Sequence, residues 1–296
     1  MNKTTNTVKT KTIKSLISAS ELLSIYKNEN VVLVDTRMGK DIKKNYLQEH
    51  LAGALHVDLN EELSDIKEDV ANGGRHPLPS IEQFSKTLSS LGITPESHVI
   101  AYDDKNGSIA SARLWWMLKA IGHKNVQVLN GGLKEAVKVG FPMSSNIETP
   151  KSVAPYYIDS WKLPVATIKQ VEKISKDKEH LVIDVRAKER YNGEMEPIDL
   201  VAGHIPGAIN VPFSSNLDEN GLFLPPKALK EKYQKVLGSR SAKNVTVHCG
   251  SGVTACHTLL AMSHAGMEIP NLYVGSWSEW SRNDMPIATI KTSNNP

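Results

Sequence analysis

Five short motifs occur in the same order in the two halves of the chain, and this repetition constrains the fold more than any other feature. The repeated segments are residues 31–37 and 181–186, 49–54 and 203–208, 99–103 and 245–249, 131–135 and 275–279, and 141–142 and 285–286. The spacing between the members of a pair varies only by the few residues that loop insertions add. Ordered self-similarity over this length predicts that one domain has been duplicated.

The length of the chain agrees with two domains, because 296 residues exceed one typical core and suit two of average size. The first domain is expected over residues 16–143 and the second over residues 166–290. Residues 144–165 carry Pro150, Pro155 and Pro164 with little periodicity, which predicts a linker. The polar residues 1–15 are predicted to form a disordered tail.

Short β-branched runs alternate with helical patterns in each half, which predicts an α/β fold. Strands are expected at residues 31–35, 99–103, 126–129, 181–185, 245–248 and 271–274, and helices at residues 81–91, 108–121, 167–175, 225–237 and 253–265. Strands that alternate with helices pair in parallel and are covered on both faces. We therefore expect two tandem domains, each a mainly parallel sheet with helices on both faces.

The composition excludes several classes of protein. The net charge is only +3 and no Lys/Arg block occurs, so a nucleic-acid partner is not indicated. No apolar run approaches the roughly 18 residues of a membrane span, and residues 1–12 lack the apolar core of a secretory signal. With two cysteines and no tight His/Cys cluster, the chain is expected in the cytoplasm without a bound metal or cofactor.

Cys249 opens the loop Cys-Gly-Ser-Gly-Val-Thr between a predicted strand and a predicted helix. The carboxyl end of a parallel strand, before a glycine turn and a helix, is where α/β folds bind ligands. Backbone N–H groups of the turn and of the first helical residues form an anion cradle, which stabilises a thiolate. Gly250 and Gly252 are both expected to adopt positive φ angles, and Ser251 and Thr254 add hydroxyl donors.

The corresponding position in the first half is Asp103, which is no sulfur nucleophile. The first half is therefore predicted to be catalytically silent. Cys256 lies within the predicted helix and is interpreted as a core thiol. Two alternatives to covalent sulfur chemistry remain at this point. A cysteine-dependent phosphatase needs an arginine where this chain has Ala255, and a non-catalytic module would only bind or sense sulfur.

These residues resemble the tandem-domain rhodaneses, the thiosulfate and 3-mercaptopyruvate sulfurtransferases. The resemblance extends from about Leu16 to Ile290, and its specific parts are the segments 203–208, 249–254 and 275–280. It implies an inactive first domain and a catalytic second domain. It also implies ping-pong transfer of a sulfane sulfur from a small anionic donor, through a persulfide on Cys249, to cyanide, a thiol or a reduced protein.

The resemblance also assigns site residues. It implies that Cys249 and Ser251 are catalytic and that Arg190 binds the donor, with the loop residues Gly250, Gly252, Val253 and Thr254 also in contact with it. His76 is the candidate partner from the first domain, because Asn60 occupies the place of the aspartate expected to assist Ser251. Arg186, His50, His204 and the tryptophans 115, 116, 277 and 280 are assigned structural roles.

The donor is left open between 3-mercaptopyruvate and thiosulfate. The neutral pair Gly250-Ser251 is typical of the mercaptopyruvate group, whereas the thiosulfate group places basic residues after the cysteine. Yet the animal mercaptopyruvate enzymes have a second arginine shortly after the first, and residues 194–199 contain none.

Overall fold

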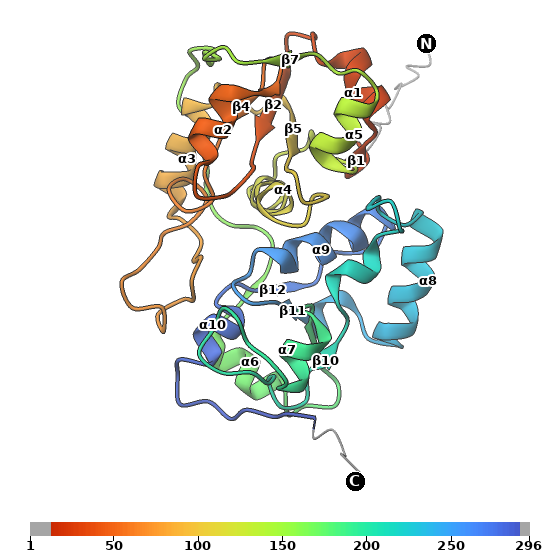
Figure 1. Ribbon diagram of the computed structural model, residues 1–296. Coiled ribbons are helices and arrows are strands. Elements are labelled where there is room, and N and C mark those ends of the chain that lie inside the picture. Colours follow the sequence, from red (N-terminus) through yellow and green to blue (C-terminus); the bar gives the residue numbers. More distant parts are fainter. Residues whose placement is uncertain (1–12, 291–296) are drawn as a thin grey trace, which may run out of the picture.

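The computed structural model describes residues 13–290 and contains two α/β domains of one topology (Figure 1). Of the tail predicted over residues 1–15, residues 1–12 lie outside the described part. The first domain contains α1 (Ala19–Ile25), α2 (Ile42–Gln48), α3 (Ile81–Ser90), α4 (Ala110–Ala120), α5 (Gly132–Lys138), β1 (Leu16–Ile17), β2 (Val31–Asp35), β3 (His50–Leu51), β4 (Leu55–His56), β5 (His98–Tyr102), β6 (Val126–Leu129) and β7 (Met143–Ser144). The second contains α6 (Ile168–Ile174), α7 (Lys188–Asn192), α8 (Pro226–Leu237), α9 (Thr254–His264), α10 (Ser276–Trp280), the 3-10 helices η1 (Phe213–Asn216) and η2 (Ala242–Asn244), β8 (Val165–Ala166), β9 (Leu181–Asp184), β10 (Ile209–Asn210), β11 (Val245–His248) and β12 (Asn271–Tyr273).

Each domain is built on a five-stranded parallel sheet. The strand order is β1-β6-β5-β2-β4 in the first domain and, in the same sense, β8-β12-β11-β9-β10 in the second. All pairs within the two sheets are parallel, and β3 and β7 form a separate antiparallel pair. The matching order confirms the predicted duplication at the level of topology.

Both faces of each sheet are covered by helices. Along β5, Val99 and Ala101 face one apolar cluster while Ile100 and Tyr102 face another. Alternation between two buried faces explains why the strands are apolar without a break. The predicted fold class is therefore confirmed, and the predicted helices and strands agree with the structure to within about two residues at each end.

The two domains share one apolar core across α4 and α9, which lie side by side between the sheets (Figure 1). Trp115 and Trp116 of α4 and Leu259 and Leu260 of α9 are fully buried. Helices buried all round in this way are apolar on every face. The interface therefore fixes the carboxyl ends of the strands of one domain against the loops of the other.

Residues 145–164 connect the domains without a helix or strand. Trp161 of this segment stacks on Phe84 and Trp116 of the first domain, and Tyr156 packs beside His123. This irregular segment coincides with the predicted linker, and these contacts tie it to the first domain.

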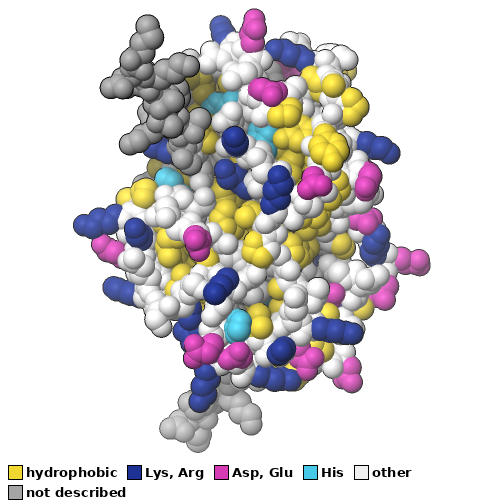
Figure 2. Space-filling model, turned by 180° about the vertical axis from the view of Figure 1, so that it is seen from behind, with side chains coloured by type: hydrophobic (Ala, Val, Ile, Leu, Met, Phe, Trp, Pro, Cys, Tyr) yellow, Lys and Arg dark blue, Asp and Glu magenta, His cyan; other side chains and the backbone are white. Residues whose placement is uncertain are grey.

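Charged side chains of both signs are distributed over the face shown in Figure 2, with apolar side chains gathered through its middle. No basic stripe crosses this face, which agrees with the small net charge. Within residues 13–290, no helix combines the length and apolar character needed to cross a membrane.

Candidate active site

Cys249 follows β11 directly and lies at the carboxyl edge of the second sheet, where the chain turns into α9. Its side chain is buried, with 3% of the residue exposed. Two backbone N–H groups of α10 fix the start of the loop, because Trp277 donates to the Cys249 carbonyl at 3.0 Å and Ser278 to the Gly250 carbonyl at 2.8 Å. The cysteine is therefore held between a central strand and two helix N-termini.

Ser276 fixes the backbone of Cys249 through a hydrogen bond. The Cys249 N–H donates to Ser276 Oγ at 3.2 Å, and that hydroxyl donates to the Tyr273 carbonyl at 2.8 Å. Ser276 adopts a φ of 53°, in the left-handed region that a serine rarely occupies. The first domain has Gly132 at the corresponding position. A strained serine in place of a glycine is typical of a functional site, and no sequence pattern indicated it.

The two glycines of the loop have different roles, and the expectation of positive φ at both was wrong for Gly250. Only Gly252 is left-handed, with a φ of 71°, and a Cβ there would lie 2.5 Å from the Val274 carbonyl oxygen. At Gly250 a Cβ would instead lie 2.9 Å from Arg75 Nη2 and 3.5 Å from Arg190 Nη2. Gly250 is therefore required for the close approach of two guanidinium groups.

The loop forms an anion cradle that is open in the second domain and filled in the first. In the first domain the Asp103 carboxylate accepts hydrogen bonds from the N–H groups of Lys105, Gly107 and Ile109, and from Ser111 Oγ.

Counted from Cys249 as those three are counted from Asp103, the positions in the second domain are Ser251, Val253 and Ala255, although α9 begins five residues after Cys249 and α4 begins seven residues after Asp103. Within residues 13–290 these three N–H groups donate to no protein acceptor. The first domain thus shows that N–H groups of this loop converge on the side chain that follows the strand, where burial raises the pKa of the Asp103 carboxyl overall although their hydrogen bonds lower it. Val253 is buried beside this cradle, and Thr254 begins α9 with its side chain half-buried.

A segment of the first domain covers the catalytic loop. His76 Nδ1 lies 2.8 Å from Ser251 Oγ, and Gly74 packs so closely on Gly275 that no side chain would fit there. Burial, together with the charges of Arg75 and Arg113, lowers the pKa of His76 to about 4, so its imidazole is neutral at physiological pH. The structure thus brings the predicted residues His76 and Ser251 together.

The second domain also covers the loop of Asp103 in the first domain, but with residues of a different chemical kind. In the second domain Gly221 packs on Asn106, and Phe223 lies against Gly107 and donates its N–H to Asn130 Oδ1. The loop of Asp103 is thus covered by a glycine and an apolar side chain, whereas the loop of Cys249 is covered by an arginine and a histidine. Both domains therefore contribute polar groups to one site.

Arg190, the predicted donor-binding residue, lies on α7 at the mouth of this site. It forms ion pairs with Glu196 at 2.6 Å and Asp199 at 3.2 Å, and 15% of its side chain is exposed. Burial raises the pKa of Glu196, but hydrogen bonds from Arg190 and from the Asp199 N–H lower it overall. These two carboxylates hold the guanidinium next to Gly250.

Asp199 gathers two further arginines that the sequence did not reveal. Its Oδ1 accepts hydrogen bonds from Arg75 Nε and Arg282 Nη1, both at 3.1 Å. The terminal nitrogens of Arg75 donate to no acceptor within the described residues, and Nη2 lies 2.9 Å from where a Cβ of residue 250 would be. Asp199 thus occupies the region where a second arginine was sought, and it brings arginines from elsewhere in the chain to the site.

Other predicted assignments can also be located. Arg186 pairs with Asp184 and Glu196 and packs on Trp277, which agrees with a structural role. Asn60 is exposed, and no hydrogen bond joins it to His76 within the described chain. Cys256 is buried in α9 and, like Cys249, forms no disulfide.

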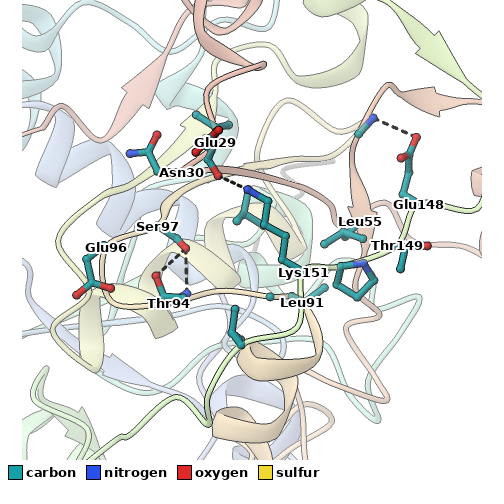
Figure 3. A pocket seen from close by; sticks show the side chains of 16 residues that line it. Glu29, Asn30, Leu55, Leu91, Thr94, Glu96, Ser97, Glu148, Thr149 and Lys151 are labelled. Carbon is teal, nitrogen blue, oxygen red and sulfur yellow. Dashed lines mark hydrogen bonds between the residues drawn. The ribbon is translucent and has the colours of Figure 1, made fainter.

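A separate pocket lies in the first domain, at the amino ends of β2 and β5 (Figure 3). Its lining includes Glu29, Glu96 and Glu148, and Lys151 crosses it to donate to the Glu29 carbonyl at 2.7 Å. Since it faces away from the carboxyl ends of the strands, it is distinct from the site around Cys249.

The fold and this site define a class of protein: a pair of α/β domains in which a buried cysteine follows a central strand of the second domain and a segment of the first domain covers its loop. The family model "Rhodanese-like domain" matches the chain twice, at residues 18–138 and 167–283. The chain therefore belongs to the rhodanese family.

Known relatives cover nearly the whole chain. It is 36% identical over 284 residues to the "Probable 3-mercaptopyruvate sulfurtransferase" of Pseudomonas aeruginosa, covering 93% of this chain and 98% of the relative. It is 34% identical over 251 residues to the rat thiosulfate sulfurtransferase, covering 83% and 82%. The crystal structure of the 3-mercaptopyruvate sulfurtransferase SseA of Escherichia coli aligns with a TM-score of 0.73 at 29% identity, covering 90% and 100%. The family resemblance and the enzyme class expected from it, a sulfurtransferase, are thereby confirmed.

Proposed function

We propose that the protein transfers a sulfane sulfur through a persulfide on Cys249, with 3-mercaptopyruvate as the favoured donor. The observation that carries this proposal is the open anion cradle at Cys249, whose counterpart in the first domain holds the Asp103 carboxylate. A loop that binds an anion at this place stabilises both the thiolate that attacks the donor and the persulfide that results.

In the first half-reaction the Cys249 thiolate attacks the donor sulfur, and a new S–S bond forms as the S–C bond of mercaptopyruvate breaks. The electron pair of that bond leaves with the pyruvate enolate, which takes up the proton of the donor thiol to give pyruvate. In the second half-reaction a thiolate or cyanide attacks the outer sulfur, and the S–S bond electrons return to Cys249. No external oxidant or reductant is needed for either transfer.

Recognition of the donor is assigned to the guanidinium groups at the mouth. Arg75 and Arg190 point terminal nitrogens at Gly250, next to the nucleophile. A guanidinium binds a carboxylate through two parallel hydrogen bonds, so an anionic donor is held with its sulfur toward Cys249.

The charge at the mouth favours a donor with a single negative charge. Three guanidinium groups, of residues 75, 190 and 282, face the two carboxylates of residues 196 and 199, which leaves one positive charge; the buried pair of Arg186 and Asp184 adds no net charge. Mercaptopyruvate carries one carboxylate, whereas thiosulfate is a dianion. The neutral residues Gly250 and Ser251 also favour a donor with a single negative charge.

The pair of Ser251 and His76 supplies the second argument for mercaptopyruvate. With the imidazole neutral, one of the two groups donates in their hydrogen bond and the hydroxyl retains capacity for the keto oxygen of the donor. A hydrogen bond there stabilises the enolate that leaves, and thiosulfate has no comparable need. Loop residues Gly252, Val253 and Thr254 complete the cradle around the sulfur.

Since Cys249 is almost fully buried, its acceptor is a small thiol, cyanide, or the exposed thiol of a reduced protein. Two free cysteines in the described chain agree with the reducing cytoplasm as the place of action.

The decisive experiment is intact mass measurement after incubation with each donor. The native protein is expected to gain one sulfur atom and lose it on addition of cyanide, while Cys249→Ser gains none. Steady-state rates with both donors then decide the preference, and a higher kcat/KM with thiosulfate would reverse our choice of donor. A gain of sulfur that persists in Cys249→Ser would refute the persulfide mechanism.

A further inference from the structure

Arg113 of α4 is a guanidinium of the silent domain that reaches the catalytic loop of the other domain. Its side chain is completely buried. Nη1 donates to the Gly252 carbonyl at 3.3 Å, and Nη2 donates to the His76 carbonyl at 3.1 Å. The group therefore joins the loop that carries Cys249 to the segment that covers it.

Arg113 differs from the other buried arginines because no carboxylate accompanies it. Arg37 and Arg186 pair with Asp35 and Asp184 at 2.7 and 2.6 Å, whereas Arg113 forms no ion pair within residues 13–290. Its Nε is buried without a hydrogen-bond partner among the same residues. A buried charge without a counter-ion is strongly destabilising, so a folded protein that keeps one requires an anion nearby.

The surroundings of Arg113 offer two sulfur atoms as that anion. Burial lowers the pKa of Arg113, and ionisation of Cys256 or Cys249 would oppose this effect. Burial also raises the pKa of Cys256 to about 12, so this thiol stays protonated, and its S–H donates to the Gly252 carbonyl at 3.3 Å. Cys249 remains as the group that can carry the negative charge.

The other charged or titratable groups around the loop do not replace Arg113. His248 and His76 are kept neutral by burial, which lowers the pKa of each. Arg75 and Arg190 have carboxylate partners in Asp199 and Glu196. Arg113 is thus the charged group around the loop that has no partner of opposite sign in the described chain. The corresponding position on α9, the fourth residue of that helix as Arg113 is the fourth of α4, is His257, which burial keeps neutral by lowering its pKa to about 3.

We propose that Arg113 is a positioning residue that stabilises the anionic sulfur of Cys249, as thiolate and as persulfide, through its buried charge and its hold on Gly252. The silent domain then supplies the counter-charge of the nucleophile in addition to its cover. The part of this inference that concerns the persulfide rests on the proposed function. The part that concerns the thiolate does not depend on that function.

The first experiment measures the rate at which iodoacetamide alkylates Cys249 at neutral pH, with alkylation followed by mass in a Cys256→Ala background. Arg113→Gln removes the charge but keeps an amide that can donate to a carbonyl, and Arg113→Lys keeps a charge. We expect alkylation about tenfold slower in Arg113→Gln, which corresponds to about one unit in the ionisation midpoint. The rate in Arg113→Lys is expected closer to that of the parent.

Arg37→Gln is the matched control, because it removes a buried guanidinium far from the loop. It is expected to lower the melting temperature without slowing alkylation. Equal alkylation rates in the parent and in Arg113→Gln would overturn the proposal, as would an equal slowing in Arg37→Gln. If Arg113→Gln does not fold, the comparison is made with Arg113→Lys across pH, where an unchanged profile would overturn the proposal.

The second experiment compares melting temperatures of sulfur-loaded and sulfur-free protein, with loading confirmed by intact mass. We expect loading to raise the melting temperature of the native protein more than that of Arg113→Gln, because only the native protein gains a partner for its buried charge. An equal rise in both proteins contradicts a role for Arg113 toward the persulfide. If the native protein does not load with either donor, the proposed function fails, while the alkylation experiment still decides the role of Arg113.

Discussion

His76 Nδ1 lies 2.8 Å from Ser251 Oγ, although 175 positions and a domain boundary separate the two residues. The contact exists because α4 and α9 pack the domains together and bring the covering segment onto the loop of Cys249. The surroundings of Cys249 are therefore built from both domains, even though the cysteine itself belongs to the second.

The first prediction concerns this pair. Ser251→Ala and His76→Ala are each expected to lower kcat/KM with 3-mercaptopyruvate by about 100-fold, the usual effect of losing a group that stabilises a leaving enolate or transfers a proton. The double variant should lose little more than either single one, because the two groups act together. Steady-state kinetics checks this, with thiosulfate as the matched control donor. An equal loss with both donors would contradict a role toward the keto oxygen.

The second prediction concerns pH and stability. The pKa of His76 is lowered to about 4 and that of His257 to about 3, both mainly by burial, whereas the unfolded chain titrates near 6.5. Between these values the unfolded state binds more protons than the folded state, so stability falls as pH falls from about 6.5 toward 4. Denaturant unfolding across this range is expected to show the loss. His257→Leu should flatten it, and an unchanged slope in that variant would contradict the buried neutral histidine.

The pH dependence of catalysis follows from the same group. Because His76 is neutral throughout pH 5–8, its titration cannot limit the rate in that range. The kcat/KM profile of His76→Asn should therefore be lower than that of the native protein but have the same shape there. A native inflection near 6.5 that disappears in the variant would refute this.

The third prediction uses the two loop glycines as a matched pair. Gly252→Ala places a side chain on a left-handed residue against the Val274 carbonyl, and we expect a stability loss of at least about 2 kcal/mol. In Gly250→Ala the added methyl group meets the flexible ends of Arg75 and Arg190 and, at 3.6 Å, Asp199 Oδ2, so stability changes little while KM for the donor rises. Thermal unfolding and donor kinetics of both variants check this contrast. A larger stability loss in Gly250→Ala would contradict it.

The internal repeats of the sequence explain why much of this architecture could be predicted. They predicted two copies of one α/β domain, and the strand before Cys249 together with the glycine turn predicted the place of the nucleophile. The comparison of Cys249 with Asp103 predicts that the first half is silent.

The rest of the site depends on contacts that no local pattern carries. Asp199 meets Arg75 of the first domain across 124 positions, a pair that forms only when the domains are packed, and it meets Arg282 of its own domain across 83 positions. The prediction for Gly250 was wrong because a glycine can be required either for a positive φ angle or for the close approach of a neighbouring group. The sequence does not distinguish the two requirements. Arg113 lies in a largely apolar helix, and its hydrogen bond to the Gly252 carbonyl of the other domain could not be predicted from the local sequence.

The fourth prediction tests the charge at the mouth. Asp199→Asn removes one of the carboxylates that offset the guanidinium groups, so the site gains one positive charge. We expect KM for the dianion thiosulfate to fall relative to KM for 3-mercaptopyruvate, by a factor of about 5 to 10 at low ionic strength. The ratio of the two KM values, measured at low and high salt, checks the effect. A ratio that does not change at low salt would contradict the electrostatic choice of donor.

The last prediction concerns the filled cradle of the first domain. In Asp103→Ala three backbone N–H groups and the Ser111 hydroxyl lose their acceptor in a buried place, which should cost about 3 kcal/mol or more of stability. Asp103→Asn keeps one oxygen as an acceptor and should cost less. Because Asp103 does not touch the catalytic loop, sulfur transfer per folded molecule should be unchanged in both variants. Denaturant unfolding and single-turnover transfer measure the two quantities separately. Equal stability of Asp103→Ala and the native protein would mean that the cradle does not require an anion, which would also weaken the argument for the thiolate at Cys249.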